Sequence, residues 1–241
     1  VALSEGLNLL SVVASDPLGR QGSHSVQVML DTSAPDVGIT APAAASLVRQ
    51  VVDFHAVAAD AIPGSGIASL TLRVDGAALA VFGQAPFEAQ LDTALLTDGP
   101  HLLEAVAVDA AGNARVARCE ITVDNTPPVV VIDAPLANTI VFGLVPFVVT
   151  AADHGAGLVS VVQRVGGLAP TQDATLAYAV PVPSDVLAGA EDTRRWSGGS
   201  AIFSATAVDA AGNTLTVESE VSVVAEPLAA LRPRCPGAVS Q

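Results

Sequence analysis

The residues of this 241-residue chain with the clearest capacity for chemistry are aspartates and asparagines in a recurring motif. The sequence Ala-Val-Asp-Ala-Ala-Gly-Asn occupies residues 107–113 and returns unchanged at 207–213. Carboxylate and amide oxygens are the ligands that Ca²⁺ prefers, about six to eight at a time. A calcium site therefore requires that side chains from several such motifs meet. Whether they meet depends on the secondary-structure elements that carry them.

Those elements are predicted to be short strands. Apolar residues alternate with other residues over 52–58 and 117–123, which is the period of strands buried on one face. Turn residues such as Gly64-Ser-Gly66 and Asp98-Gly-Pro100 separate the runs. About seven short strands in each 90 to 100 residues, without a useful helical period, predict an all-β fold of tandem immunoglobulin-like β-sandwiches with antiparallel Greek-key sheets.

Internal repeats indicate the domain organisation. Residues 3–19 align with 96–112, the register continues to Asp60 and Asp153, and 107–113 returns at 207–213. The Pro-rich joints between the copies predict the C-terminal half of a preceding Ig-like domain at 1–35, Ig-like domains at 36–126 and 127–226, and a C-terminal tail at 227–241. A half-domain cannot bury its apolar face alone, so we expect it to be cut from a longer array or completed by another chain.

The candidate metal ligands gather at two joints of this array. In an Ig-like sandwich the B–C and F–G loops lie at the end where the chain enters, so acids ending those strands should converge with acids of the preceding linker. The first expected group is Asp31, Asp60 and Asp109, and the second is Asp124, Asn125, Asp153 and Asp209 with Asn213. Ca²⁺ is the candidate ion for these joints, and the second joint is the favoured one because Arg20 replaces the turn asparagine in the half-domain.

An alternative explanation of the same residues is turn chemistry. An aspartate before Ala-Ala-Gly-Asn forms a hydrogen bond to its own hairpin turn, and the Asp-Asn-Thr-Pro-Pro sequence at 124–128 forms a stiff turn. Turn chemistry explains each residue singly, whereas metal binding explains why they gather at one end. Both interpretations remain open at this stage.

The repeated ending, with the strand and the Asp124-Asn-Thr-Pro-Pro128 joint that follow it, closely resembles bacterial Ig-like repeats of large surface proteins and adhesins. The strand leading to Asp60 and the following Ser65-Gly-Ile-Ala-Ser-Leu strengthen the resemblance, which covers about residues 1–226. It implies an extracellular or bacterial cell-surface stalk or adhesion role. Ig-like folds serve many functions, so the resemblance alone does not select one.

Charge and motif content argue against several classes of function. Ten Arg, no Lys and 24 acidic residues give a net charge of −14, which argues against nucleic acid or an anionic membrane as partner. No run approaches the roughly 18 apolar residues of a membrane-spanning helix, so no membrane insertion is expected. His24, His55, His101 and His154 are expected on solvent-facing strand positions or in turns, and no catalytic motif accompanies them, so the chain is predicted not to be an enzyme.

The two cysteines are not expected to pair. Cys119 shares the parity of inward-facing residues and is predicted to be a buried thiol. Cys235 lies in the tail, too far along the chain to reach it, and is free to link to another chain.

The favoured function is a non-catalytic structural or adhesive segment of an extracellular stalk, fibre or adhesin. Its expected partners are other Ig-like domains of the same or a neighbouring chain, with a surface protein or glycan partner left unidentified. One alternative is a filament subunit in which strand complementation completes the N-terminal half-domain. A second alternative is an accessory binding module of a secreted enzyme, which the scarcity of aromatic residues disfavours.

Overall fold

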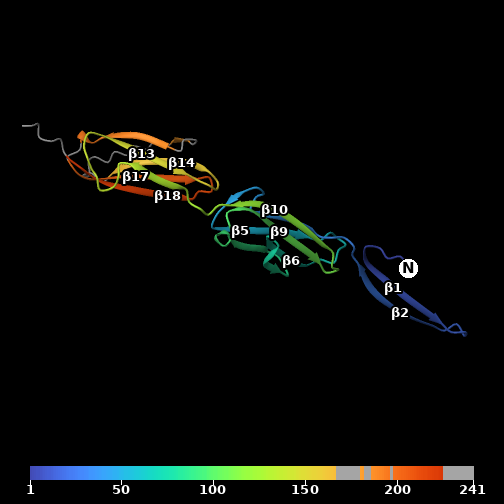
Figure 1. Cartoon of the computed structure of the whole chain (residues 1–241). Coiled ribbons are helices and arrows are strands. Elements are labelled where there is room, and N and C mark those ends of the chain that lie inside the picture. The colour runs from blue at the N-terminus through green and yellow to red at the C-terminus, as the bar shows by residue number, and fades with distance from the viewer. Residues whose placement is uncertain (167–179, 182–185, 196–197, 225–241) are drawn as a thin grey trace, which may run out of the picture. The chain divides into compact units, whose positions relative to one another are not determined.

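The structure is a computed structural model that describes residues 1–166, 180–181, 186–195 and 198–224 (Figure 1). The chain divides into two compact units, Val1–Asn125 and Thr126–Gln241. The described residues form strands joined by turns and two short 3-10 helices, η1 (Thr93–Leu95) and η2 (Thr193–Arg195). The predicted tail at 227–241, with Cys235, lies outside the described residues.

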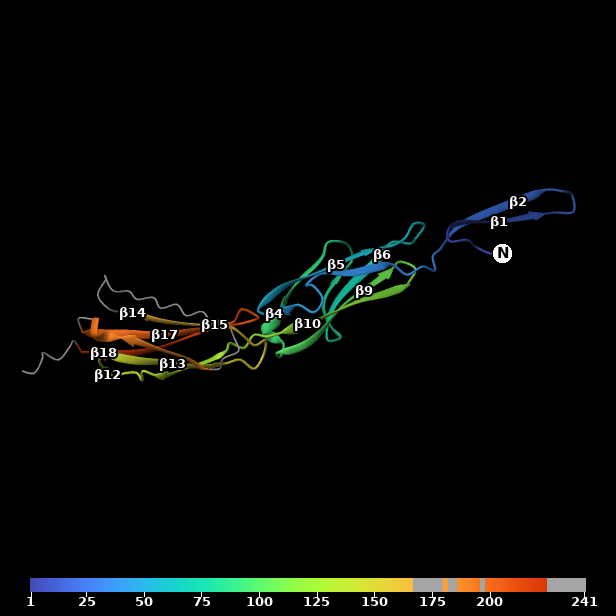
Figure 2. The same ribbon diagram turned by 90° about the horizontal axis from the view of Figure 1, so that it is seen from above.

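The first unit contains one complete sandwich of two sheets, in which most strand pairs are antiparallel. The three-stranded sheet has the order β3 (Asp36–Ala41), β5 (Val51–Ala59), β8 (Phe87–Asp92). The five-stranded sheet has the order β4 (Leu47–Val48), β10 (Ala114–Val123), β9 (Gly99–Asp109), β6 (Ile67–Val74), β7 (Ala77–Phe82). Strand β4 pairs with β10 in the parallel sense, and the other ladders are antiparallel, so the chain crosses between the sheets as in Ig-like folds (Figure 2).

The second unit repeats this strand order. Its three-stranded sheet is β11 (Val129–Ala134), β13 (Leu144–Ala152), β16 (Val186–Asp192). Its five-stranded sheet is β12 (Ile140–Val141), β18 (Thr214–Val223), β17 (Gly199–Asp209), β14 (Leu158–Gly166), β15 (Val180–Pro181). The predicted fold class, all-β with tandem Ig-like sandwiches, is confirmed.

The alternating apolar residues of the strands make the core of each sandwich. In the first unit Phe54 and Leu103 are fully buried between the sheets, and Cys119 is buried beside them with its pKa raised by burial. In the second unit Phe147 and Phe203 meet edge to face with ring centroids 5.0 Å apart. Burial on alternate residues holds the sheets face to face, and the loops at their ends are thereby fixed in position.

The N-terminal residues form a hairpin of β1 (Gly6–Ser15) and β2 (Gln21–Leu30), which is a separate two-stranded sheet. Its register, from Gly6 opposite Leu30 to Ser15 opposite Gln21, repeats that of β9 and β10 residue for residue. The hairpin thus has the form of the last two strands of an Ig-like sandwich. The linker that follows it leads directly into β3.

Candidate cation site in the first unit

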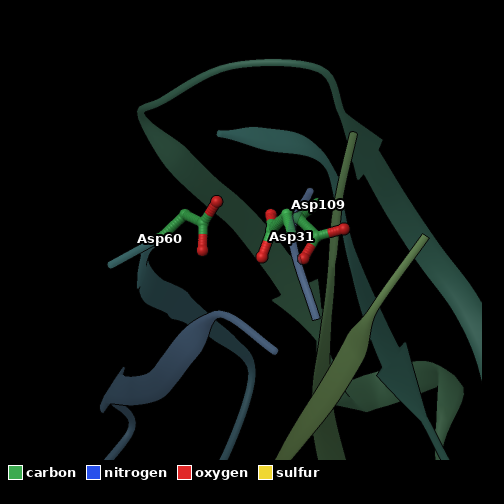
Figure 3. A group of neighbouring side chains, drawn as sticks. All are labelled: Asp31, Asp60 and Asp109. Carbon is green, nitrogen blue, oxygen red and sulfur yellow. The ribbon is translucent and has the colours of Figure 1, made fainter. Parts of the chain in front are cut away.

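Three carboxylates from separate segments meet at one end of the first sandwich. Asp31 follows β2, Asp60 follows β5, and Asp109 is the last residue of β9. Oxygen atoms from the three lie within 4.8 Å of one another, and Figure 3 shows Asp31 and Asp109 side by side with Asp60 facing them. The structure therefore brings the first predicted group together.

Asp109 is fixed by the turn that joins β9 to β10. Its Oδ1 accepts a hydrogen bond from the Asn113 backbone amide at 2.8 Å, and its Oδ2 accepts one from Asn113 Nδ2 at 2.9 Å. Gly112 has φ +97°, a left-handed conformation that closes the turn and suits glycine. Asp109 is buried at 2% exposure, so its carboxylate is held in place away from bulk solvent.

Asp31 connects the linker to the sandwich through hydrogen bonds. Its Oδ2 accepts from the Ser65 amide at 2.8 Å, and its Oδ1 accepts from the Ser33 amide at 3.1 Å. Hydrogen bonds from Ser65 first, and then from the Ser33 backbone, hold the pKa of Asp31 below its ordinary value. Asn113 Nδ2 also donates to the Asp31 carbonyl at 3.2 Å, so one asparagine contacts two of the three aspartates.

Asp60 leaves one carboxylate oxygen without a hydrogen-bond partner. Its Oδ2 accepts from the Gly66 amide at 2.7 Å, whereas its Oδ1 is buried and unpartnered. The loop folds tightly around this carboxylate, because a Cβ atom on Gly64 would lie 2.5 Å from Asp60 Oδ2 and 2.3 Å from the Ala61 carbonyl oxygen. A buried carboxylate oxygen without a partner is costly, and a bound cation would remove that cost.

The electrostatics of the group favour a cation. No ion pair among the described residues includes Asp31, Asp60 or Asp109. Three carboxylates this close repel one another when they are ionised, and a bound cation would offset that repulsion. Oxygen ligands from three segments suit Ca²⁺, with backbone carbonyls and water completing the roughly six to eight ligands that it takes.

The second unit repeats two of the three supporting segments. The Asp209 carboxylate accepts from the Asn213 amide at 2.8 Å and from Asn213 Nδ2 at 2.9 Å. Asp153 Oδ2 accepts from the amides of Gly155 and Gly157. The Gly157 carbonyl in turn accepts from the Ala210 amide at 2.9 Å, as the Gly66 carbonyl accepts from Ala110 at 2.9 Å in the first unit. In both sandwiches the F–G acid is held by the asparagine of its turn and the B–C acid by a glycine amide, and Asp153 accepts one further bond, from Gly155.

Comparison with known proteins identifies the family of the first sandwich. Residues 35–105 match the family described as bacterial Ig domain. This segment is a bacterial Ig domain. Domains of this family are typically non-catalytic. No curated protein matches the sequence of the chain.

Solved structures that are similar to the chain have low sequence identity to it. The fibronectin(III)-like modules of Clostridium thermocellum CbhA are 18% identical with a TM-score of 0.41, over 79% of this chain and 94% of theirs. A structure described as explaining host cell surface retention of a 1.5-MDa bacterial ice-binding adhesin is 18% identical with a TM-score of 0.36, over 92% and 76%. A tetra-tandem repeat from the extending region of a large adhesion protein is 22% identical with a TM-score of 0.37, over 93% and 58%.

The linker residue Asn125 has a role that differs from the predicted one. Its side-chain oxygen accepts from the Gln50 amide at 2.8 Å and from Thr93 Oγ1 at 3.2 Å, and its Nδ2 donates to the Thr93 carbonyl at 2.9 Å. Both acceptor positions of the amide oxygen are therefore filled inside the bacterial Ig domain. Asn125 ties the end of the domain to Gln50 and η1, and a ligand role for it does not fit this bonding.

The predicted ligand roles of Asp124 and Asn213 are still untested. The Asp124 amide donates to the Val48 carbonyl at 3.0 Å within the first unit. Asn213 Nδ2 donates to Asp209 and to the Thr126 carbonyl, so its nitrogen positions Asp209. The meeting of Asp124, in the first unit, with Asp153 and Asp209, in the second, stays a prediction.

His101 lies where we did not expect it. It is buried at 9% exposure in β9 instead of facing solvent. Its Nδ1 lies 2.6 Å from Asp75 Oδ2 and its Nε2 lies 2.7 Å from the Thr97 carbonyl oxygen. Both ring nitrogens are engaged, so this His–Asp pair has no nitrogen available to activate a nucleophile. The part of the chain that the structure describes also contains no helix long and apolar enough to cross a membrane.

Two residues of the first sandwich that support the acids were missed from the sequence. Asn113 aligns with Asn213 in the repeated motif, and that alignment was sufficient to find it. Ser65 donates its amide to Asp31 and accepts a hydrogen bond at Oγ from the Ala111 amide at 3.0 Å. Ala156 stands at the equivalent position of the second unit, so repetition gave no signal for Ser65.

Proposed function

We propose that the chain is a non-catalytic structural and adhesive segment of a bacterial extracellular or cell-surface protein. Successive Ig-like sandwiches act as spacers, and their partners are other Ig-like domains of the same or a neighbouring chain. The observation that carries the proposal is the meeting of Asp31, from the linker, with Asp60 and Asp109, from the sandwich. A linker acid that lies against the following sandwich suits a structural protein whose domains are held in series.

We propose further that this meeting point binds Ca²⁺. The three carboxylates offer a concentrated negative charge, and the buried Oδ1 of Asp60 has no other partner. Because the ligands come from a linker and two sandwich loops, one ion would join segments that are 29 and 49 residues apart in sequence. Such an ion would restrict the linker and raise the stability of the first unit by mass action.

The test is a calorimetric titration of Ca²⁺ into the whole chain, with melting curves in millimolar Ca²⁺ and in chelator. In the unaltered chain we expect a higher melting temperature with Ca²⁺ than with chelator. In Asp109→Asn we expect the heat of Ca²⁺ binding at the first joint to be lost, together with the rise in melting temperature that this site provides. Asp16→Asn is the matched control, because Asp16 holds the same turn position in the hairpin. There it is already paired with Arg20, whose Nε lies 2.5 Å from its Oδ2. Equal melting temperatures with and without Ca²⁺ in the unaltered chain would overturn the calcium proposal.

A further inference from the structure

The loop between β5 and β6 contains a dipeptide, Ser65-Gly66, that binds two of the three clustered carboxylates through its backbone. The Ser65 amide donates to Asp31 Oδ2 at 2.8 Å. The next amide along the chain, that of Gly66, donates to Asp60 Oδ2 at 2.7 Å. Two consecutive amides therefore hold an acid of the linker and an acid of the sandwich beside each other.

The same dipeptide also binds the turn that carries the third carboxylate. Ser65 Oγ accepts a hydrogen bond from the Ala111 amide at 3.0 Å, and the Gly66 carbonyl accepts one from the Ala110 amide at 2.9 Å. Ala110 and Ala111 directly follow Asp109 in the sequence. The dipeptide therefore connects the linker, its own loop and the β9–β10 turn, which are the three segments that supply the acids.

The hydroxyl group of Ser65 connects the turn to the linker. Because its oxygen accepts from the Ala111 amide, its own proton is available to a second partner. The side-chain hydrogen bond from Ser65 to Asp31 is the largest of the causes that hold the pKa of Asp31 below its ordinary value. Alanine stands at the equivalent position of the second sandwich, Ala156, and it has no hydroxyl to make this connection.

Asp31 is fixed by bonds that need no ion. Besides the bonds from Ser65, its Oδ1 accepts from the Ser33 amide at 3.1 Å, and its backbone carbonyl accepts from Asn113 Nδ2 at 3.2 Å. The residue is buried at 8% exposure. A carboxylate has about four acceptor sites, so the bonds from Ser33 and from the amide and hydroxyl of Ser65 leave room for a cation.

We propose that Ser65 is a positioning residue, which holds Asp31 of the linker against the first sandwich before any ion binds. The three carboxylates are then gathered in advance. Binding of Ca²⁺ does not have to order the linker, and the conformational entropy saved in this way raises the affinity. The effect on affinity rests on the proposed calcium function, whereas the attachment of the linker in the absence of the ion does not.

The attachment of the linker is tested by amide hydrogen exchange of the whole chain in chelator, measured residue by residue by NMR. We expect the Ser33 amide, which donates to Asp31, to be protected, and Ser65→Ala to lower that protection by about tenfold. Ser69→Ala is the matched control, because Ser69 is also half-buried but lies four residues along the chain, on β6. A Ser33 amide that is protected only when Ca²⁺ is added would overturn the proposal, because the ion would then recruit the linker.

The effect on affinity is tested by calorimetric titration of Ca²⁺ at a temperature where all variants are folded. We expect Ser65→Ala to raise the dissociation constant of the first joint by about tenfold, and Ser69→Ala to leave it unchanged. If Ser65→Ala lowers the melting temperature in chelator but leaves the dissociation constant unchanged, Ser65 has a structural role only and the positioning role is overturned. An unaltered chain that binds no Ca²⁺ would contradict the calcium function, while protection of Ser33 in chelator would still support the attached linker.

Discussion

Asn113 binds the carboxylate of Asp109 at both oxygens, through its backbone amide at 2.8 Å and its side-chain nitrogen at 2.9 Å. The same side-chain nitrogen reaches the Asp31 carbonyl at 3.2 Å. One short side chain therefore sets the direction of an acid in the sandwich and also holds the linker that brings the second acid. Asn213 and Asp209 repeat the first part of this arrangement in the second unit.

Replacing Asn113 with alanine should weaken both the turn and the cation site. The variant Asn113→Ala loses the bonds to Asp109 and Asp31, one of them to a charged acceptor, so we expect the free energy of unfolding of the first unit to fall by about 1–3 kcal/mol. Calcium affinity should fall with it, because Asp109 is no longer oriented. Differential scanning calorimetry of the whole chain measures the first effect, and Gln90→Ala, at an exposed position on β8, is the control. A variant as stable as the control would show that the backbone alone holds the turn.

Gly64→Ala should disturb Asp60 specifically. Its Cβ would lie 2.3 Å from the Ala61 carbonyl oxygen and 2.5 Å from Asp60 Oδ2, so the loop must open and the carboxylate must move. We expect lower stability and, at the first joint, weaker Ca²⁺ binding by calorimetric titration. Gly38→Ala is the matched control, since its Cβ would lie 3.7 Å from Val57 Cγ2, an ordinary contact. Full calcium affinity in Gly64→Ala would exclude Asp60 from the site.

The strands and the meeting of the first three acids could be predicted because both depend on local periodicity and on repetition. The alternation around Phe54 and Cys119 places those residues inside, and the sandwich topology then brings the ends of β5 and β9 together. The role of Asn125 could not be predicted in this way. Its partner Gln50 is 75 residues away, and no pattern in the linker indicates that its oxygen is already used.

His101 shows a different limit of sequence interpretation. It shares the parity of Leu103 and Ala105, so periodicity alone places it inside, whereas the polarity of histidine argues for the surface. The position is decided by Asp75, which reaches it from the turn between β6 and β7. A residue that lies inward only because a distant acid pairs with it cannot be assigned from its own strand.

The core of the second unit contains polar residues where the first has leucines. Leu72 and Leu91 are 0% and 4% exposed, and the aligned residues Gln163 and Glu191 are 3% and 1% exposed. Buried polar groups can be replaced by apolar residues at little cost when no partner is left unpaired, whereas a buried partner that loses its bond costs stability. We expect Gln163→Leu/Glu191→Leu to be at least as stable as the unaltered chain, and Glu191→Leu alone to be about 1–3 kcal/mol less stable.

Chemical denaturation of the single and double variants measures this coupling. The matched pair Leu72→Gln and Leu91→Glu, made in the first unit, should destabilise that unit strongly because both leucines belong to its buried apolar cluster. If Glu191→Leu alone stabilises the second unit, Glu191 is not part of a network that matters for folding.

The pair of His101 and Asp75 should make the stability of the first unit depend on pH. The hydrogen bond to Asp75, opposed by burial, raises the pKa of His101, and the bond to His101 lowers the pKa of Asp75. A raised histidine pKa adds stability that is complete below the unfolded value of about 6.5 and is lost as pH rises through the higher folded value. A lowered aspartate pKa adds stability above about 3.8 that is lost as pH falls through the lower folded value. The pair should therefore stabilise most between about pH 4 and 6.5.

Melting temperatures of the unaltered chain and of His101→Ala measure the effect between about pH 5 and 9. Alanine is a suitable replacement because Ala201 stands at the equivalent place in the second sandwich, where it is buried. The difference in melting temperature between the unaltered chain and His101→Ala should shrink as pH rises. A difference that stays constant over this range would mean that His101 contributes by packing and not by charge, because only the charged ring can donate to Asp75 and to the Thr97 carbonyl at once.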